Sequence, residues 1–147
     1  MVRAAIHFLA LALALGGHSE VFGCSCIART TTQEHVEAAA HIFVGRLLKT
    51  ESIEAREEPK GWPGVAGIVE LRELIKSTTP PPPRVITGVG SGDCGVPMYP
   101  ALAYVFFAGP KGEIDICSGT RPYVKGNEEH ERYLNDVRAL ATFKSAP

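Results

Sequence analysis

The residues of this chain that are best suited to chemistry are its four cysteines, two of which stand almost together. Cys24 and Cys26 flank Ser25, whereas Cys94 and Cys117 lie far downstream. Such cysteines either pair as disulfides or bind a metal as thiolates. A ring closed between the two neighbouring cysteines would strain disulfide geometry. Two pairings therefore remain open, and in both of them each N-terminal cysteine bonds to a distant one.

A four-cysteine zinc site is the alternative to a disulfide framework. Structural zinc sites usually offer two short cysteine pairs, whereas this chain has one. The choice depends on the compartment, because disulfides persist in oxidising surroundings. The region before Cys24 therefore has to be interpreted next.

Residues 1–23 have the order of parts that is typical of a secretory signal peptide. Arg3 supplies a positive start, and residues 4–15 form an apolar run interrupted by one histidine. This run is shorter than the about 20 apolar residues that a membrane-spanning helix needs. Small or moderate side chains precede the expected cleavage point. We predict cleavage after Gly23, which leaves residues 24–147 as one secreted, extracellular or periplasmic domain with no transmembrane span.

A lipid-anchored form is the alternative to this export route. A small residue directly before a leader-end cysteine also fits a bacterial lipoprotein, in which Cys24 would carry the lipid. The bulky Phe22 and the long polar stretch after Leu15 fit that signal less well. A free or an acylated amine on Cys24 separates the two interpretations.

The composition favours a packed domain and excludes some classes of partner. Hydrophobic residues make up 45% of the chain, which is enough for a core. The 15 Lys and Arg residues nearly balance the 16 Asp and Glu residues. This balance gives no reason to expect nucleic acid or an anionic membrane surface as a partner.

The pattern along the chain predicts short strands with a helix on either side of them. Thr31 and Glu34 form a capping box for a helix that ends near residue 40. Asn127 caps a final helix that ends near residue 143, and its apolar stripe is typical of core packing. Five strands are predicted at residues 42–50, 65–75, 84–87, 102–108 and 113–117. The second of these also fits a helix, and the last two are expected to form a hairpin.

Three connections separate these strands. Residues 51–64 are charged and end in "GWPG", which predicts a long hairpin loop. Residues 78–83 have the composition of a stiff polyproline spacer. Residues 88–95 contain closely spaced glycines but lack the Lys-Ser/Thr pair of a phosphate-binding loop, so we interpret them as a tight turn that carries Cys94. Gly45, within the first strand, is expected to mark a bulge or a bend.

The remaining titratable residues form no catalytic constellation. Asp93, Glu113 and Asp115 could act as an acid–base pair, but no spacing demands it. His35 and His41 do not share one helical face. We therefore predict neither an enzymatic activity nor a cofactor.

Taken in order, these features resemble the tissue inhibitors of metalloproteinases and, more broadly, the netrin-like modules. The features are an opening "CSCI", a strand "IFVGRLLKT", "CG" before "AYVFFAG", then "CSGTRPY" and a final helix. The resemblance extends over nearly all of residues 24–143. It implies a mainly-β fold with two flanking helices, built as a five-stranded, OB-fold-like Greek-key barrel with a disulfide-anchored N-terminus.

The resemblance also implies a disulfide pairing and a mode of binding. It pairs Cys24 with Cys94 and Cys26 with Cys117. In the family, the α-amine and carbonyl oxygen of the first cysteine grip the zinc of a metalloprotease, and the next side chain enters the specificity pocket. The matching positions are Cys24 and Ser25, so the expected partner is a zinc metalloendopeptidase.

Elementary chemistry is consistent with that mode of binding. A free α-amine has a pKa near 8 and is partly neutral at neutral pH, and it forms a five-membered ring with the carbonyl of its own residue. In an extended segment, alternate side chains point to opposite sides, so the serine faces away from both sulfurs. The expected contact edge consists of Cys24, Ser25, Cys26, Ile27, Ser91, Gly92 and Asp93.

The sequence also departs from the family. Vertebrate members carry a third disulfide in this domain and a second cysteine-rich domain, and neither is present in this sequence. We therefore expect packing alone to hold the C-terminal helix. The alternative function is a non-inhibitory binding module of the cell envelope or extracellular space, because fold analogy by itself does not carry function.

Overall fold

The structure is a computed structural model of the chain, and it describes residues 24, 26, 31–54, 63–77 and 79–143. The predicted leader lies outside these residues, as do Ser25, Ile27 and most of the predicted hairpin loop. The elements are, in chain order, α2 (Thr32–Ala38), β1 (His41–Ile53), β2 (Gly64–Ser77), β3 (Arg84–Gly88), the 3-10 helix η1 (Ser91–Asp93), β4 (Ala103–Ala108), β5 (Arg121–Tyr123) and α3 (Glu128–Phe143).

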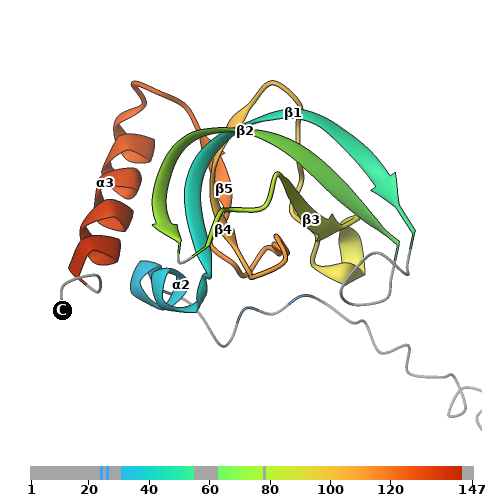
Figure 1. Cartoon of the computed structure of the whole chain (residues 1–147), viewed down its shortest axis with the longest axis horizontal. Helices are drawn as coiled ribbons and strands as arrows, with labels where there is room; N and C mark the ends of the chain where they lie inside the picture. The colour runs from blue at the N-terminus through green and yellow to red at the C-terminus, as the bar shows by residue number, and fades with distance from the viewer. Residues whose placement is uncertain (1–23, 25, 27–30, 55–62, 78, 144–147) are drawn as a thin grey trace, which may run out of the picture.

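The five strands form one antiparallel sheet in the order β3-β2-β1-β4-β5. Strands β1, β2 and β3 are successive neighbours, and β4 returns to the other side of β1, which is the strand order of a Greek key. Figure 1 shows β1 and β2 arching over the other strands, with α2 and α3 at one end of the sheet. The predicted class, mainly β with two helices, is confirmed.

The longest part of the sheet is the hairpin of β1 and β2, whose strands contain 13 and 14 residues. Its register shifts at several places, including between Val44 and Gly45, where the sequence predicts a bulge or a bend. Such irregularities bend a strand and increase its twist. The segment at 65–75, which fits two periodicities, is a strand because β1 and β3 pair with its two edges.

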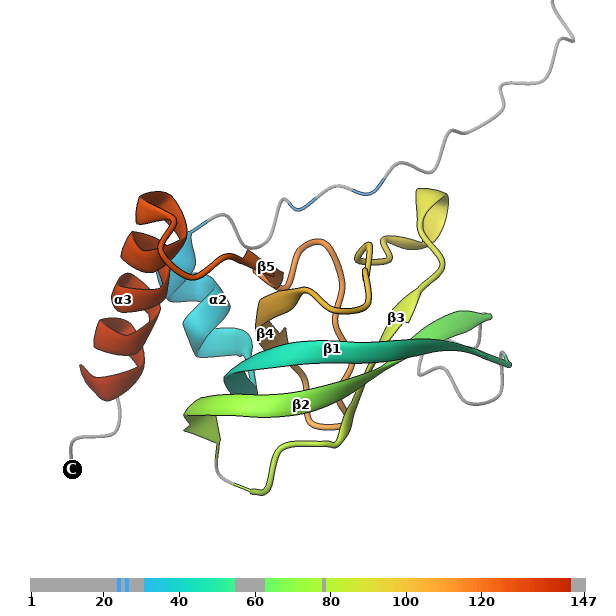
Figure 2. The ribbon, with the colours of Figure 1, turned by 90° about the horizontal axis from the view of Figure 1, so that it is seen from above.

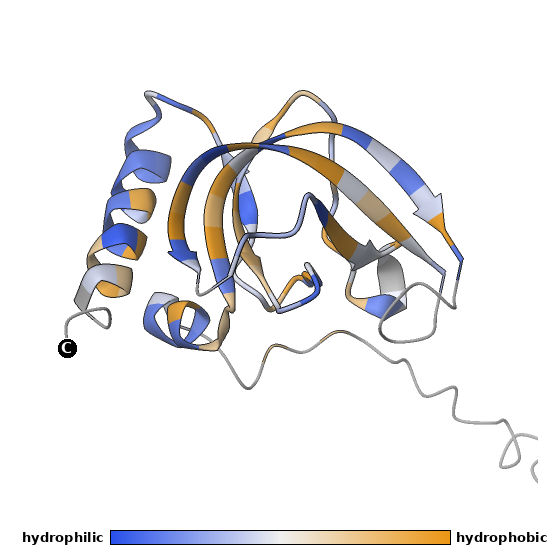
Figure 3. Cartoon of the chain, in the orientation of Figure 1, coloured by the Kyte–Doolittle hydropathy of each residue, from blue (hydrophilic) through white to orange (hydrophobic). Residues whose placement is uncertain are grey.

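Alternation along the strands gives the sheet two apolar faces. The inner face, enclosed by the curved sheet, is formed mainly by Phe43, Leu47, Val85, Tyr104 and Phe106. The outer face is formed by Ile42, Val44, Val105 and Phe107, and is covered by Val36 of α2 and by Leu134, Val137 and Ala141 of α3. Figures 2 and 3 show both helices against this end of the sheet, with apolar residues on the side of α3 that faces the strands. The predicted packing role of the final helix is confirmed.

The predicted fifth strand at 113–117 is wrong, because the strand that pairs with β4 is β5, further along the chain. The backbone groups of 113–117 bond to other partners. The Ile114 N–H donates to the carbonyl of Ile86 in β3 at 2.8 Å, and the Ile116 N–H donates to the carbonyl of Cys94 at 3.0 Å. Each backbone donor needs a partner, and these bonds draw the segment away from β4.

The sheet is not closed, so a barrel is not confirmed. Strands β3 and β5 are its two edges. A single isolated parallel bridge joins Ile86 of β3 to Glu113, in the segment that follows β4. The described strands therefore form a strongly curved Greek-key sheet that approaches closure at one point.

Side chains fix both ends of α2. The Thr31 hydroxyl accepts the Glu34 N–H at 3.2 Å, and the Glu34 carboxylate accepts the Thr31 N–H at 2.9 Å, so the predicted capping box is confirmed. At the other end, the ammonium of Lys76 in β2 donates to the carbonyls of Val36 and Ala39 at 2.7 and 2.6 Å. A cation at this position satisfies carbonyls that the helix itself leaves unpaired.

The C-terminal helix is held by more than packing, which corrects the expectation drawn from the missing third disulfide. The Asn127 side chain accepts the backbone N–H groups of Glu129 and His130, both at 3.1 Å, which confirms it as the N-cap. Further along, Arg138 makes a bidentate pair with Glu73 of β2, at 2.8 and 2.7 Å. The ion pair therefore ties α3 to the sheet.

This pair predicts an acid-sensitive contribution to stability. Hydrogen bonds from Arg138 hold the pKa of Glu73 below its usual value, although partial burial opposes this shift. A carboxylate with a lowered folded-state pKa stabilises the fold above its unfolded pKa, and this stabilisation is lost as the pH falls through the folded value. We expect Glu73→Gln to lower the free energy of unfolding at pH 7 by roughly 0.5–1 kcal/mol, because the pair is partly exposed.

Thermal melting of wild type and variant across the acidic range measures this contribution. The difference between them should vanish in strong acid, where both side chains are neutral. Glu70→Gln, which removes the singly bonded and exposed partner of Arg72, should have a smaller effect. A Glu73→Gln deficit that persists unchanged in acid would show that the ion pair is not its source.

Candidate functional site

Two disulfides fasten the N-terminal segment to the fold. They join Cys24 to Cys94, with Cα atoms 5.5 Å apart, and Cys26 to Cys117, with Cα atoms 5.2 Å apart. These are the pairings that the family resemblance implies. All four cysteines are therefore used, and no thiolate is left for a four-cysteine zinc site. Disulfides of this kind are compatible with an extracellular or periplasmic protein.

The two anchoring cysteines lie on different loops, and the loops are bonded to each other. Cys94 follows η1 after β3, whereas Cys117 lies in the turns between β4 and β5. The backbone N–H of Ile116, beside Cys117, donates to the Cys94 carbonyl at 3.0 Å. The attachment points of the N-terminal segment are thus fixed relative to one another.

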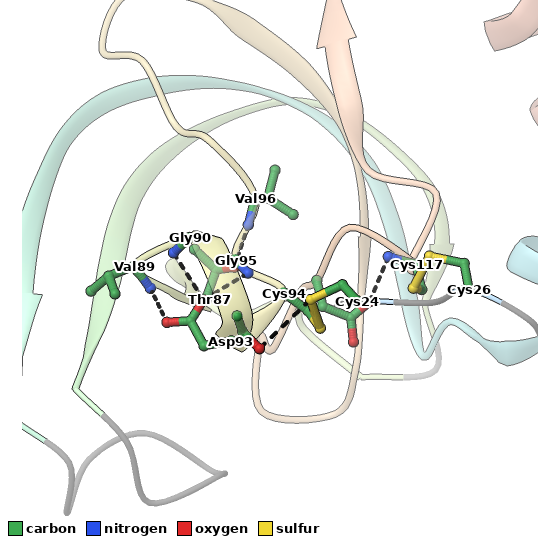
Figure 4. The surroundings of a disulfide bond; sticks show 12 residues. Cys24, Cys26, Thr87, Val89, Gly90, Asp93, Cys94, Gly95, Val96 and Cys117 are labelled. Atoms are coloured by element: carbon green, nitrogen blue, oxygen red, sulfur yellow. Dashed lines mark hydrogen bonds between the residues drawn. A yellow bond between two sulfur atoms is a disulfide. The ribbon is translucent and has the colours of Figure 1, made fainter. Parts of the chain in front are cut away.

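The loop that carries Cys94 is organised by one carboxylate. Asp93 accepts three backbone N–H groups of its own loop, from Val89 at 2.7 Å, Gly90 at 2.9 Å and Gly95 at 3.0 Å. Figure 4 shows these bonds converging on Asp93 beside the Cys24–Cys94 disulfide. The carboxylate replaces the ladder bonds that these N–H groups lack once β3 has ended.

The same loop requires unusual backbone conformations. Gly90 has a φ of 105° and Cys94 a φ of 63°, both in the region that favours glycine. A cysteine held at positive φ costs free energy that the surroundings must offset. Part of the support comes from buried Thr87, whose hydroxyl accepts the Val96 N–H at 2.8 Å. Together these bonds fix the direction in which Cys94 meets Cys24.

The loop of Cys117 is built in a similar way. The Asp115 carboxylate accepts the Cys117 N–H at 2.9 Å, and the Asp115 carbonyl accepts the Ser118 N–H at 3.0 Å. The Glu113 carboxylate accepts the Lys111 N–H at 2.8 Å. Each of the three acids that could have formed an acid–base site thus bonds to backbone N–H groups of its own turn. Sequence reasoning missed the turn-forming role of Asp93 and Asp115, although Asp in a stretch rich in turn residues is the usual signal of such a role.

The expected contact edge is described in part. Ser91, Gly92 and Asp93 form η1, and the Gly92 carbonyl oxygen lies 3.8 Å from the Sγ of Cys24. This is a contact and not a hydrogen bond, because a disulfide sulfur carries no proton. Ser25 and Ile27 lie outside the described residues. Asp93 turns its carboxylate into its own loop and therefore supports the edge from within.

Two exposed apolar side chains in the loops that carry the anchoring cysteines were not anticipated from the sequence. Val89, in the loop of Cys94, is 68% exposed, and Ile116, next to Cys117, is 45% exposed. Large apolar residues in loops rich in Gly, Asp and Ser are the signal that could have found them.

Comparison with known protein families finds none that matches this chain, and comparison with curated proteins finds no match either. Within the described ranges, no helix is long and apolar enough to cross a membrane. The same part of the chain contains no group of three or more His, Cys, Asp or Glu side chains placed to hold a metal ion.

The arrangement around Asp93 predicts that this residue is needed to hold the Cys94 loop. Asp93→Ala should lower the free energy of unfolding by roughly 2–4 kcal/mol, because several bonds to a charged acceptor are lost. Asp93→Asn should be intermediate, since its single carbonyl oxygen can still accept the two N–H groups that now bond to Oδ1. Denaturant unfolding of the oxidised protein measures both effects.

Amide hydrogen exchange locates the effect of these variants. The amides of Val89, Gly90 and Gly95 should lose protection before those of β1 and β4. Asp136→Ala, which removes an exposed carboxylate of α3, is the matched control and should stay within about 0.5 kcal/mol of wild type. If Asp93→Ala behaves like this control, the carboxylate does not organise the loop.

Proposed function

We propose that this protein is an exported inhibitor of zinc metalloendopeptidases, in which the α-amine and carbonyl oxygen of Cys24 chelate the zinc of the protease. The proposal takes the chain to begin at Cys24 after removal of residues 1–23, and the Ser25 side chain to enter the adjacent specificity pocket. It rests on the resemblance to the tissue inhibitors of metalloproteinases and on the geometry of the disulfide-anchored segment.

The observation that carries the proposal is the double anchoring of the N-terminal segment. Cys24 and Cys26 are bonded to two loops that are themselves joined through the Ile116 N–H and the Cys94 carbonyl. A segment tied at two positions so close in sequence has little conformational freedom left to lose on binding. Preorganisation of this kind raises affinity, because the ordering cost is already met in the free protein.

The chemistry of the chelate suits a protease zinc. A catalytic zinc has three protein ligands and keeps a further position for water or substrate. The α-amine and the carbonyl oxygen of Cys24 can together bind the zinc at the position that water or substrate would otherwise occupy. The amine must be unprotonated to bind, and its ordinary pKa near 8 leaves part of the population neutral at neutral pH.

The proposed contact surface extends beyond the first residues. Gly92 lies beside Cys24, and the loops that carry Cys94 and Cys117 also contain the exposed side chains of Val89 and Ile116. A docking surface with apolar groups around a central anchor is typical of tight interfaces. We therefore add Val89 and Ile116 to the edge that is expected to contact the protease.

The proposal extends to the fold, which we take to be an OB-like barrel. An OB-fold is a five-stranded and partly open Greek-key barrel. The order β3-β2-β1-β4-β5 and the parallel bridge from Ile86 to Glu113 support this assignment, since the bridge lies where the two ends of the sheet would meet.

A single added residue gives the sharpest test. We expect an alanine placed before Cys24 to lower inhibition of a susceptible zinc endopeptidase by at least about 100-fold, which corresponds to roughly 3 kcal/mol. The extension turns the amine into an amide, which cannot donate its lone pair to zinc, and it occupies the space of the chelate. The measurement is the inhibition constant against a panel of zinc endopeptidases.

Two controls accompany this measurement. The melting temperature and circular dichroism of the extended protein should match those of the parent, because the disulfides and the sheet are unaffected. Ser25→Gly should change inhibition less than the extension does, and by an amount that differs between proteases. An extended protein that inhibits as well as the parent would falsify chelation by Cys24.

The mass of the mature N-terminus separates this function from the alternative. A mass corresponding to a free Cys24 amine permits chelation, whereas an acylated Cys24 forbids it. Acylation, or the absence of inhibition across the panel by an authentic N-terminus, would favour a non-inhibitory binding module of the cell envelope.

A further inference from the structure

A pocket of about 490 Å³ lies on the outer face of the sheet, beside α3 and away from the disulfides. Its volume falls within the range of about 300–1,000 Å³ that is usual for small-molecule sites. The pocket is lined by Val44, Arg46, Arg72, Glu73, Ala101, Ala103, Tyr123, Lys125, Leu134 and Arg138.

The pocket exists because α3 covers only part of the outer face. Val44 and Leu134 are buried where helix and sheet meet. Two residues further along β1, Arg46 points to the same face by alternation, but it is exposed. Opposite it in the sheet stands the small side chain of Ala103, which pairs with Arg46 on one side and with Tyr123 on the other. The result is an apolar floor with a charged rim.

Two positive charges of the rim form no ion pair within the described part of the chain, although Glu70 of β2 is the cross-strand neighbour of Arg46. Arg72 and Arg138 are paired with carboxylates of β2. Among the described residues, neither Arg46 nor Lys125 makes an ion pair; the only hydrogen bond of the Arg46 guanidinium goes to the Ala101 carbonyl at 3.4 Å. The Glu131 carboxylate accepts the Gly126 N–H and the Tyr123 hydroxyl, and the charge of Lys125 adds only the smallest of the effects that lower the pKa of this carboxyl.

One residue that lines the pocket, Ala101, has a strained backbone conformation. Ala101 has a φ of 74°, a conformation that a residue with a Cβ seldom adopts. Its N–H donates to the Leu47 carbonyl at 2.8 Å, and its own carbonyl faces Arg46. Strained backbone tends to be kept where a site requires it, and here it fixes the acceptor that holds the Nε edge of the guanidinium.

We propose that this pocket binds an organic anion that has an apolar body. The acidic group, a carboxylate, sulfate or phosphate, lies between Arg46 and Lys125, and the apolar part packs against Ala103 and Tyr123, which are partly exposed in the pocket. A guanidinium suits such groups because its planar set of donors matches two acceptor oxygens at once. This site is separate from the Cys24 edge and does not depend on the inhibitory function.

A matched pair of probes tests the proposal. The oxidised, exported protein, labelled with ¹⁵N, is titrated with 1-naphthoate and, separately, with the neutral 1-naphthamide. We expect saturable shifts at the amides of Ala101, Ala103, Tyr123 and Leu134 for the anion, with a Kd on the order of 0.1–1 mM, as is common for small unoptimised ligands. The neutral analogue should bind at least about tenfold more weakly.

Further probes identify the acidic group and the role of the apolar body. Naphthalene-1-sulfonate and 1-naphthyl phosphate, compared with 1-naphthoate, distinguish the three kinds of acid. Inorganic sulfate tests the charge alone and should bind more weakly than naphthalene-1-sulfonate. Equal affinity for the two would overturn the apolar part of the proposal.

Substitutions in the rim provide the second arm. The double variant Arg46→Gln, Lys125→Gln should weaken binding of 1-naphthoate by about 10- to 100-fold, because both charged contacts are lost. The matched control is Arg132→Gln, Lys111→Gln, which removes the same two charge types from exposed positions outside the pocket. The control should bind as wild type does, and melting curves should show both variants folded.

The proposal fails on any of three results. One is the absence of saturable shifts at the pocket amides; another is equal binding of 1-naphthoate and 1-naphthamide. The third is equal loss of affinity in the rim and control variants, which would indicate attraction by overall charge and not by this pocket. Affinity that falls with ionic strength for wild type, but hardly for the rim variant, would support it further.

Discussion

The placement of the N-terminal segment at Cys24 and Cys26 depends on two covalent constraints of long sequence separation. The disulfides join residues 70 and 91 positions apart. In the chain-entropy description, closing one loop of such length lowers the entropy of the unfolded chain enough to stabilise the fold by roughly 4–5 kcal/mol, and the second bridge adds less because the first already shortens its loop. Gains of this size are comparable to the net stability of a small domain. The disulfides therefore contribute to the stability of the fold as well as to the presentation of Cys24.

A crosslink of this kind positions a segment only if its far ends are themselves rigid. Cys94 and Cys117 both lie in irregular loops, where backbone groups have no ladder to bond with. Asp93 and Asp115 supply the missing acceptors, and the Ile116 N–H joins the two loops. The candidate site is thus supported in three steps. The strands fix the ends of the two loops, the carboxylates of Asp93 and Asp115 order the loops, and the disulfides attach Cys24 and Cys26 to them.

Much of the fold could be predicted from local chemistry. The capping box at Thr31 and the Asn127 cap depend on residues a few positions apart, and a continuous apolar run identified the buried strand that became β4. The hairpin expected between β4 and residues 113–117 does not form. The apolar residues of this segment are compatible with pairing to β4 and equally with an extended segment that bonds elsewhere, so the pattern alone could not choose its partner. Only the backbone bonds to Ile86 and Cys94, which are remote in sequence, decide against pairing with β4. The helix-or-strand ambiguity of β2 was likewise resolved by pairing on both of its edges.

The two candidate sites differ in how well the sequence alone predicts them. The reason is how far apart their residues lie along the sequence. The Cys24 edge leaves a signal because Cys24, Ser25 and Cys26 are adjacent in sequence. The pocket leaves none, since Arg46 and Lys125 are far apart in the sequence and a nearly balanced net charge conceals them. β4 connects the two regions: it begins at Ala103 in the pocket wall and leads, beyond Ala108, into the turns that carry Cys117. Because its side chains are almost entirely buried, this strand gives both sites a common rigid support, while the loops at its two ends are free to differ in chemistry.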